Sequence, residues 1–100
     1  MQIMKIYVSQ RKLRDAGQIP AMIETLETGG VLPRVLLSHS QDGSIQIEDG
    51  HHRLVAIWLS GRRELKQHEY LLLEKDQWRP RFGKITDLLA RCGDVPARAQ

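Results

Sequence analysis

Residues 48–53 (EDGHHR) constrain the fold of this chain more than any other stretch. They follow an alternating, strand-like run at 44–48 and precede an apolar, helical run at 54–59. A strand that turns at a glycine into a helix with cationic first residues brings free backbone N–H groups and the positive helix end to one place. The pattern predicts a phosphate pocket at the start of this helix.

Hydrophobic periodicity and turn residues predict an α/β (α+β) domain with a small mixed sheet and packed helices. Asp42-Gly43 lies between two apolar runs, which favours an antiparallel hairpin. Pro20 suits the start of a helix, and Gly29-Gly30 suits its end. The predicted strands are 3–8, 35–38, 45–48 and 70–73, and the predicted helices are 21–28, 51–60 and one beginning near residue 86.

Length and composition predict one domain. A chain of 100 residues with 41% apolar content has enough apolar surface for one core, which we expect to span residues 1–92. Residues 93–100 have the composition of a flexible tail. The balance of 15 Lys and Arg against 12 Asp and Glu gives a net charge of +3, which favours anionic partners.

Two further features bear on the compartment. The single cysteine, Cys92, excludes an internal disulfide and is typical of a reducing environment. No stretch has the length and apolar character of a signal sequence or a membrane span. We therefore expect a cytoplasmic protein without a membrane partner.

Each residue of the motif has a physical role in the predicted pocket. Gly50 permits close approach of the backbone to a ligand, and Arg53 offers a planar fork of donors that matches phosphate oxygens. His51 and His52 are candidate donors or proton shuttles beside a polyphosphate. Alternation along the strand directs Glu48 and Asp49 to opposite faces, and we expect Asp49 to reach the pocket, as a ligand for a divalent ion or a proton acceptor.

A purely structural interpretation also fits part of the motif. Asp49-Gly50 would be an ordinary turn in which Asp49 caps the helix, and Arg53 would pair with Glu48 on the surface. This interpretation explains the turn, but it explains two histidines followed by an arginine less well. A zinc site is a further alternative, although the four histidines have no metal-binding spacing; they are His39, His51, His52 and His68.

The motif, Asp49-Gly50-His51-His52-Arg53, resembles the second motif of the ParB/sulfiredoxin-like superfamily, in which Gly-x-x-Arg precedes a helix. An upstream segment, residues 30–37 (GVLPRVLL), resembles the first motif of the same superfamily, which follows a short helix. Together the two motifs cover residues 19–62. The resemblance implies the ParB/sulfiredoxin-like fold and a bound nucleotide, ATP or CTP with Mg²⁺.

The resemblance also implies roles for individual residues. His52 and Arg53 match positions that hold nucleotide phosphates in sulfiredoxins, and Thr25 matches a nucleotide-binding position by spacing. His51 stands where sulfiredoxins have their nucleophilic cysteine, so the resemblance does not extend to sulfinic-acid reduction. The similar Asp-Gly-His-x-Arg motif of free-serine kinases implies Asp49 and His52 as catalytic residues, with Asp49 also holding the metal.

The function inferred from the sequence is nucleotide binding by a ParB-like domain, with NTPase or phosphotransferase activity left open. Two alternatives are a DNA-associated ParB-like protein, as a nuclease or partition-type accessory, and a non-catalytic protein-interaction module. Nucleic acid is a candidate partner because basic residues and two aromatic rings gather in the second half of the chain. They are Arg62, Arg63, Lys75, Trp78, Arg79, Arg81, Phe82, Lys84 and Arg91.

Overall fold

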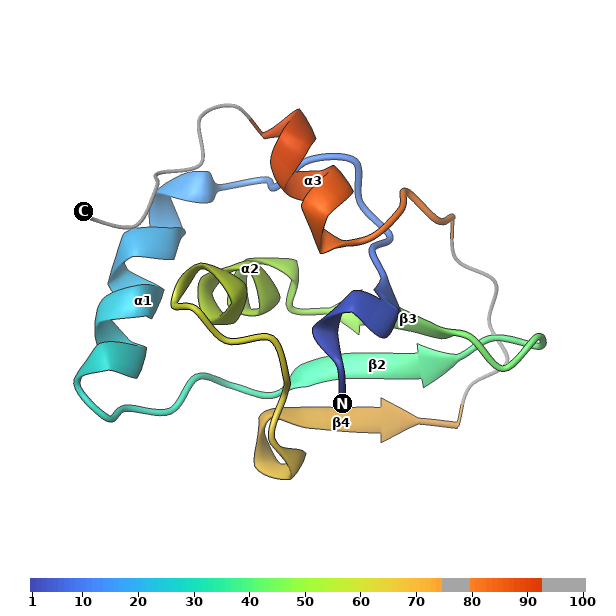
Figure 1. Cartoon of the computed structure of the whole chain (residues 1–100), viewed down its shortest axis with the longest axis horizontal. Coiled ribbons are helices and arrows are strands. Elements are labelled where there is room, and N and C mark those ends of the chain that lie inside the picture. The colour runs from blue at the N-terminus through green and yellow to red at the C-terminus, as the bar shows by residue number, and fades with distance from the viewer. Residues whose placement is uncertain (75–79, 93–100) are drawn as a thin grey trace.

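The computed structural model describes residues 1–74 and 80–92 and shows a four-stranded mixed sheet with three α-helices (Figure 1). The α+β class and the mixed sheet expected from the sequence are confirmed. The strands are β1 (Ile6–Tyr7), β2 (Val35–His39), β3 (Ile45–Asp49) and β4 (Tyr70–Leu73). The α-helices are α1 (Ile19–Glu27), α2 (His51–Leu59) and α3 (Ile85–Arg91), and three 3₁₀ turns are η1 (Ile3–Lys5), η2 (Ala16–Gln18) and η3 (Gln67–Glu69).

A hairpin of β2 and β3 forms the centre of the sheet. The two strands run antiparallel, as the Asp-Gly signal predicts. Gly43 takes a left-handed conformation with φ of 82°, and Asp42 Oδ1 accepts the backbone N–H of Ser44 at 3.0 Å. Ser40 N–H donates to the Ser44 carbonyl at 2.9 Å and closes the turn.

The two edge strands join this hairpin in parallel. The strand order is β1-β3-β2-β4, with β1 parallel to β3 and β4 parallel to β2. Each parallel pair needs a crossover, and the crossovers carry helices, as expected for such connections. The segment from β1 to β3 includes α1 and the whole of β2, whereas α2 lies between β3 and β4.

The helices cover the core, with α2 in the middle of the molecule and α1 beside it (Figure 1). Apolar residues of α2 are buried at every position from Leu54 to Ile57, as the predicted helical run requires. Cys92 is buried and belongs to this core as a packed thiol. The core residues are Ile3, Ile6, Val8, Ile19, Ile23, Val35, Leu37, Ile47, Leu54, Val55, Ala56, Ile57, Leu65, Ile85, Leu88 and Cys92.

The N-terminal prediction is wrong in one respect. The alternation from Ile3 to Val8 predicts one strand, but residues 3–5 form η1 and only Ile6–Tyr7 form β1. The physical reason is a non-local partner: Ile3 N–H donates to the carbonyl of Arg63 at 3.0 Å, and Gln2 forms an antiparallel bridge with Glu64. A 3₁₀ turn then buries both Ile3 and Ile6, because residues three apart share one face.

Two sequence-based expectations touch residues outside the described ranges. They are the tail at 93–100 and the contributions of Lys75, Trp78 and Arg79 to a basic surface. Among the helices in residues 1–74 and 80–92, none is long and apolar enough to cross a membrane.

Candidate anion site at the start of helix α2

A β-bulge precedes the motif and separates its two carboxylates. Leu37 opposes Ile47 and Leu36 opposes Asp49, so Glu48 is the extra residue of β3. Glu48 Oε1 accepts the hydroxyl of Ser38 at 2.7 Å, on the sheet. Asp49 is exposed at the end of β3, beside the start of α2, but the bulge interrupts the alternation on which the prediction of its position depends.

Gly50 connects β3 to α2 and is required there for two reasons. Its φ of 104° lies in the left-handed region, which side chains with a Cβ rarely adopt. A Cβ at this position would also lie 3.2 Å from Cζ of Arg53. Gly50, and not Asp49, is therefore the N-cap of α2, and no side chain caps the helix. The structural alternative in which Asp49 caps the helix is wrong.

Arg53 holds its guanidinium over this turn with two contacts. Its NH1 donates to the carbonyl of Arg34 at 2.6 Å, and its NH2 donates to Asp49 Oδ2 at 3.1 Å. The side chain of Arg53 is 17% exposed, whereas that of Asp49 is 68% exposed. Arg53 therefore pairs with Asp49 across one helical turn, and not with Glu48, so this part of the structural alternative is also wrong.

His51 is the buried member of the histidine pair. Its Nε2 accepts the backbone N–H of Ser9 at 3.0 Å, so the proton of the neutral ring lies on Nδ1. Burial, and secondarily the neighbouring His52, lower the pKa of His51 to about 4. A neutral, buried His51 positions the segment after β1 and is not a charged donor near pH 7.

His52 is half-buried and contacts a different segment. Its Nε2 accepts the backbone N–H of Asp15 at 3.0 Å, just before η2. An accepting Nε2 carries no proton, so His52 is a neutral imidazole in this arrangement. The ring thereby fixes the loop that leads into α1 against the start of α2.

The start of α2 also carries the positive end of a helix. The first intrahelical hydrogen bond runs from Leu54 N–H to the Gly50 carbonyl at 2.9 Å, and the first turn contains no acidic side chain. The N–H groups of residues 51–53 precede that bond and are the groups that a helix leaves for a ligand or for water. The cation of Arg53 lies beside them.

Thr25 is not brought to this site by its hydrogen bonds. Its Oγ1 donates to the carbonyl of Ala21 at 3.0 Å within α1, and its carbonyl accepts the N–H of Gly30 at 2.8 Å. Asp49 has Arg53 as its ion-pair partner. Within residues 1–74 and 80–92, no three histidine, cysteine or carboxylate side chains gather as a metal centre.

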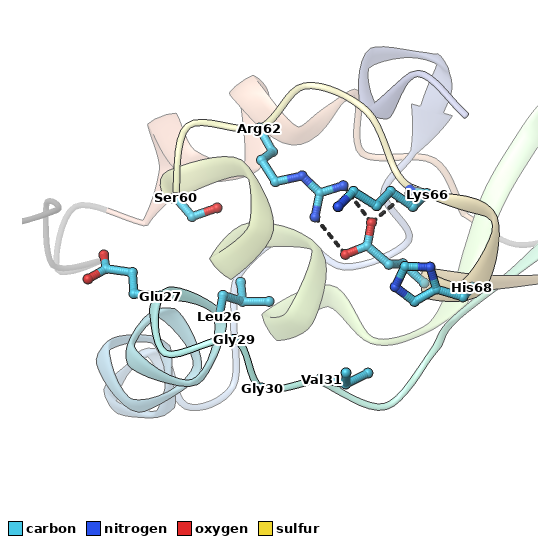
Figure 2. A pocket seen from close by; sticks show the side chains of 10 residues that line it. Leu26, Glu27, Gly29, Gly30, Val31, Ser60, Arg62, Lys66 and His68 are labelled. Atoms are coloured by element: carbon cyan, nitrogen blue, oxygen red, sulfur yellow. Dashed lines mark hydrogen bonds and ion pairs between the residues drawn. The ribbon is translucent and has the colours of Figure 1, made fainter.

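Sequence reasoning missed a hollow at the other end of α1 and α2 (Figure 2). It has a volume of about 440 Å³ and is lined by the end of α1, the turn after α2 and η3. Arg62 donates to both carboxylate oxygens of Glu69, and Glu69 Oε1 also accepts the backbone N–H of Lys66 at 2.7 Å. Figure 2 shows this ion pair on the wall formed by η3.

A second hollow of about 600 Å³ lies along β4. Its lining combines the cation Arg34 and the imidazole of His68 with the apolar strand, through Tyr70, Leu71 and Leu72. Neither hollow is lined by residues 49–53. The sequence signal for both was weak, because each joins segments that are 30 or more residues apart.

Within the motif, Gly50, Arg53 and Asp49 therefore lie in contact with one another. His51 and His52 instead bind the backbone of segments that precede α1. No protein-family model, curated protein or solved structure matches this chain.

Proposed function

We propose that this protein binds the phosphates of a nucleotide at the start of α2, with Arg53 as the principal anchor. One observation carries the proposal: the Arg53 guanidinium lies over Gly50 at a helix start that no side chain caps. A cation, a glycine turn and backbone N–H groups at one point are the elements of a phosphate site. The sequence resemblance to the ParB/sulfiredoxin-like superfamily supports a nucleotide over a simple anion.

Arg53 can exchange its partner at small cost. Its NH1 is anchored by the Arg34 carbonyl, whereas its NH2 contacts a carboxylate that is 68% exposed. Exposed ion pairs contribute about 0–1 kcal/mol, so a phosphate can replace Asp49 at NH2. Asp49 then becomes available to Mg²⁺ bound to the same phosphates, which is the role proposed for it as metal ligand.

The two histidines have different proposed roles. His51 is buried and keeps the pocket in shape through Ser9, with its backbone N–H directed to the phosphates. His52 is half-buried, and it contacts phosphate only after its Nε2 releases the N–H of Asp15. Binding would therefore loosen the loop before α1, and His52 with Asp49 would then be the pair available for NTPase or phosphotransferase chemistry.

Isothermal titration tests this proposal with ATP and with CTP, each with and without Mg²⁺. We expect saturable binding to the parent protein and a loss of about 100-fold in affinity for Arg53→Ala, the scale of a charge-assisted bidentate contact. Arg63→Ala removes the same charge from a side chain that covers Trp58, and should bind as the parent does. Release of inorganic phosphate from the bound nucleotide then tests turnover.

Two controls separate binding from damage to the fold. Arg53→Lys keeps the charge but removes the planar fork, so it should bind with intermediate affinity. Thermal unfolding of each variant shows whether the fold is retained. Equal affinities of the parent and a folded Arg53→Ala variant would contradict the proposal. A titration that shows no heat of binding with either nucleotide would also contradict it.

Nucleic acid is a second candidate ligand, favoured by a separate group of cations on aromatic rings. Arg81 and Lys84 both lie over the ring of Tyr7, at 4.8 and 3.9 Å, and Arg11 lies 5.7 Å from the centre of the Phe82 ring. Residues 82 and 83 form backbone hydrogen bonds with Val8, so the segment that carries Arg81, Phe82 and Lys84 lies beside the end of β1.

The salt dependence of DNA binding distinguishes this cationic group from the pocket at α2. Binding of single-stranded DNA through these side chains should weaken with added salt, and Lys84→Ala should reduce the slope of that dependence by about one ion. Arg53→Ala should leave the slope unchanged. Salt-independent binding, or equal slopes for the parent and Lys84→Ala, would exclude this surface as a DNA contact.

A further inference from the structure

The outer edge of β4 presents an uncharged strand. Strand β4 lies at the end of the sheet order and pairs only with β2 in the described part of the chain. Its sequence is YLLL, and the side chain of Leu71 is 42% exposed. Edge strands usually carry a charge, a proline or a bulge that blocks pairing with a further strand. None of these devices is present in Tyr70–Leu73.

The two ends of this edge have opposite charges. The hollow beside the start of β4 is lined by Arg34 and His68, and it has no acidic lining residue. The exposed Glu74 follows the last residue of the strand. An antiparallel copy of the same edge would place each cationic end against an acidic one.

Symmetry restricts the register of such a pair. A twofold axis perpendicular to a sheet keeps each side chain on its own face, so one residue must lie opposite its own copy. With Leu71 opposite itself, Tyr70 lies opposite Leu72, and Glu74 of the partner subunit lies opposite His68. With Leu72 opposite itself, Tyr70 would face Glu74 of the partner subunit. The first register places the imidazole of His68 against a carboxylate, which can accept a hydrogen bond from it, and buries the exposed leucine.

We propose that β4 pairs antiparallel with β4 of a second copy of this chain, with Leu71 at the twofold axis. The result is a continuous eight-stranded sheet, twice the four strands of one chain. Its contacts are independent of the pocket at α2, so the dimer does not depend on the proposed nucleotide.

Sedimentation analysis from about 1 µM to about 500 µM protein tests the dimer. We expect a concentration-dependent dimer, and Leu71→Lys should weaken association at least tenfold, because two ammonium groups would meet at the axis. Met4→Lys is the matched control: Met4 is 43% exposed and belongs to η1, which leads into β1 at the opposite edge of the sheet, so this variant should associate as the parent does.

A charge exchange tests the register and does not rely on a destabilised variant. His68→Glu places two glutamates opposite each other and should weaken association, and adding Glu74→Lys to it should restore the dimer. A parent protein that stays monomeric at the highest concentration would overturn the proposal and leave the edge to an extended segment of another protein. A folded Leu71→Lys variant that dimerises as the parent does would also overturn it.

Discussion

The backbone N–H of Ser9 donates to Nε2 of His51 over 3.0 Å, which ties the segment after β1 to the first residue of α2. The hydroxyl of Ser9 also donates to the carbonyl of Ile47 at 2.9 Å. One serine thus joins β3, β1 and α2 immediately behind the proposed pocket. The arrangement requires a neutral His51, because a protonated Nε2 could not accept the N–H.

Acid should therefore destabilise the protein through His51. Its pKa falls from 6.5 to about 4 on folding, mainly by burial and secondarily by His52, while Asp49 opposes the shift. Above pH 6.5 both the folded and the unfolded forms are neutral. Between pH 6.5 and 4 the unfolded state binds more protons, so stability falls by a total on the order of 3 kcal/mol.

Chemical denaturation between pH 5 and pH 7 measures this effect. His51→Gln keeps an acceptor near Ser9 but does not titrate, so its stability should vary much less over that range. His39→Gln is the control, because His39 is exposed and the pH dependence of the parent should persist. A parent protein whose stability is flat from pH 7 to pH 5 would contradict a buried, neutral His51.

Substitution of Gly50 should cost more than that of Gly43, a left-handed glycine with open space around it. Gly50→Ala forces φ of 104° on a residue with a Cβ and brings that Cβ to 3.2 Å from the Arg53 guanidinium. We expect a loss of about 2–3 kcal/mol in the free energy of unfolding. Gly43→Ala, with φ of 82° but no atom within 4 Å of the new Cβ, should lose about 1 kcal/mol. Urea titration measures the free energy of unfolding of both variants. Equal losses would show that the Arg53 side chain moves away from the new Cβ without cost.

The Arg62–Glu69 pair should stabilise the link between α2 and β4. Glu69 Oε1 accepts from Arg62 and from the N–H of Lys66, and the hydrogen bond from Arg62 is the main reason that the pKa of Glu69 is lowered. Glu69→Gln replaces one acceptor oxygen with a donor, and we expect a loss of about 1–3 kcal/mol.

Thermal unfolding at two pH values tests this pair. A lowered carboxylate pKa stabilises the fold above the ordinary value of 4.5, and this contribution disappears as the pH falls through the folded pKa. The parent and Glu69→Gln should therefore differ at pH 7 and converge in strong acid. Glu64→Gln is the matched control, since Glu64 is exposed and its carboxylate accepts a hydrogen bond from the side chain of Gln2 at 3.1 Å.

Cys92 should react with thiol reagents only when the protein opens. It is 5% exposed, and its Sγ accepts the backbone N–H of Leu13 at 3.5 Å. Because the sequence contains one cysteine, a colorimetric thiol assay reports this site alone. We expect labelling at least 100-fold slower in buffer than in denaturant. Comparable rates would place the thiol at the surface.

The sequence predicted the hairpin and α2 well because their signals are local. Asp42-Gly43 sets the turn, and apolar residues from Leu54 to Ile57 set the helix, without help from distant segments. The 3₁₀ turn at Ile3 could not be predicted from local signals, because hydrogen bonds to the distant residues 63–65 determine it.

The site was predicted in composition but not in its contacts. Strand alternation predicts opposite faces for Glu48 and Asp49, but the bulge at Glu48 interrupts that alternation, and the bulge depends on the pairing with β2. The partners of the two histidines, Ser9 and Asp15, are about 40 residues away and carry no sequence signal that marks them.

The strand order has a consequence for the path of folding. The central hairpin closes a short loop, whereas each parallel edge strand must wait until a crossover of 25 or more residues has closed. Loop closure of this kind slows contacts between distant segments, so β2 and β3 should form first and both edges later. Ser9 and His51 meet only when β1 docks. The proposed phosphate pocket is therefore completed in the last step of folding, although Asp49 belongs to the hairpin that forms first.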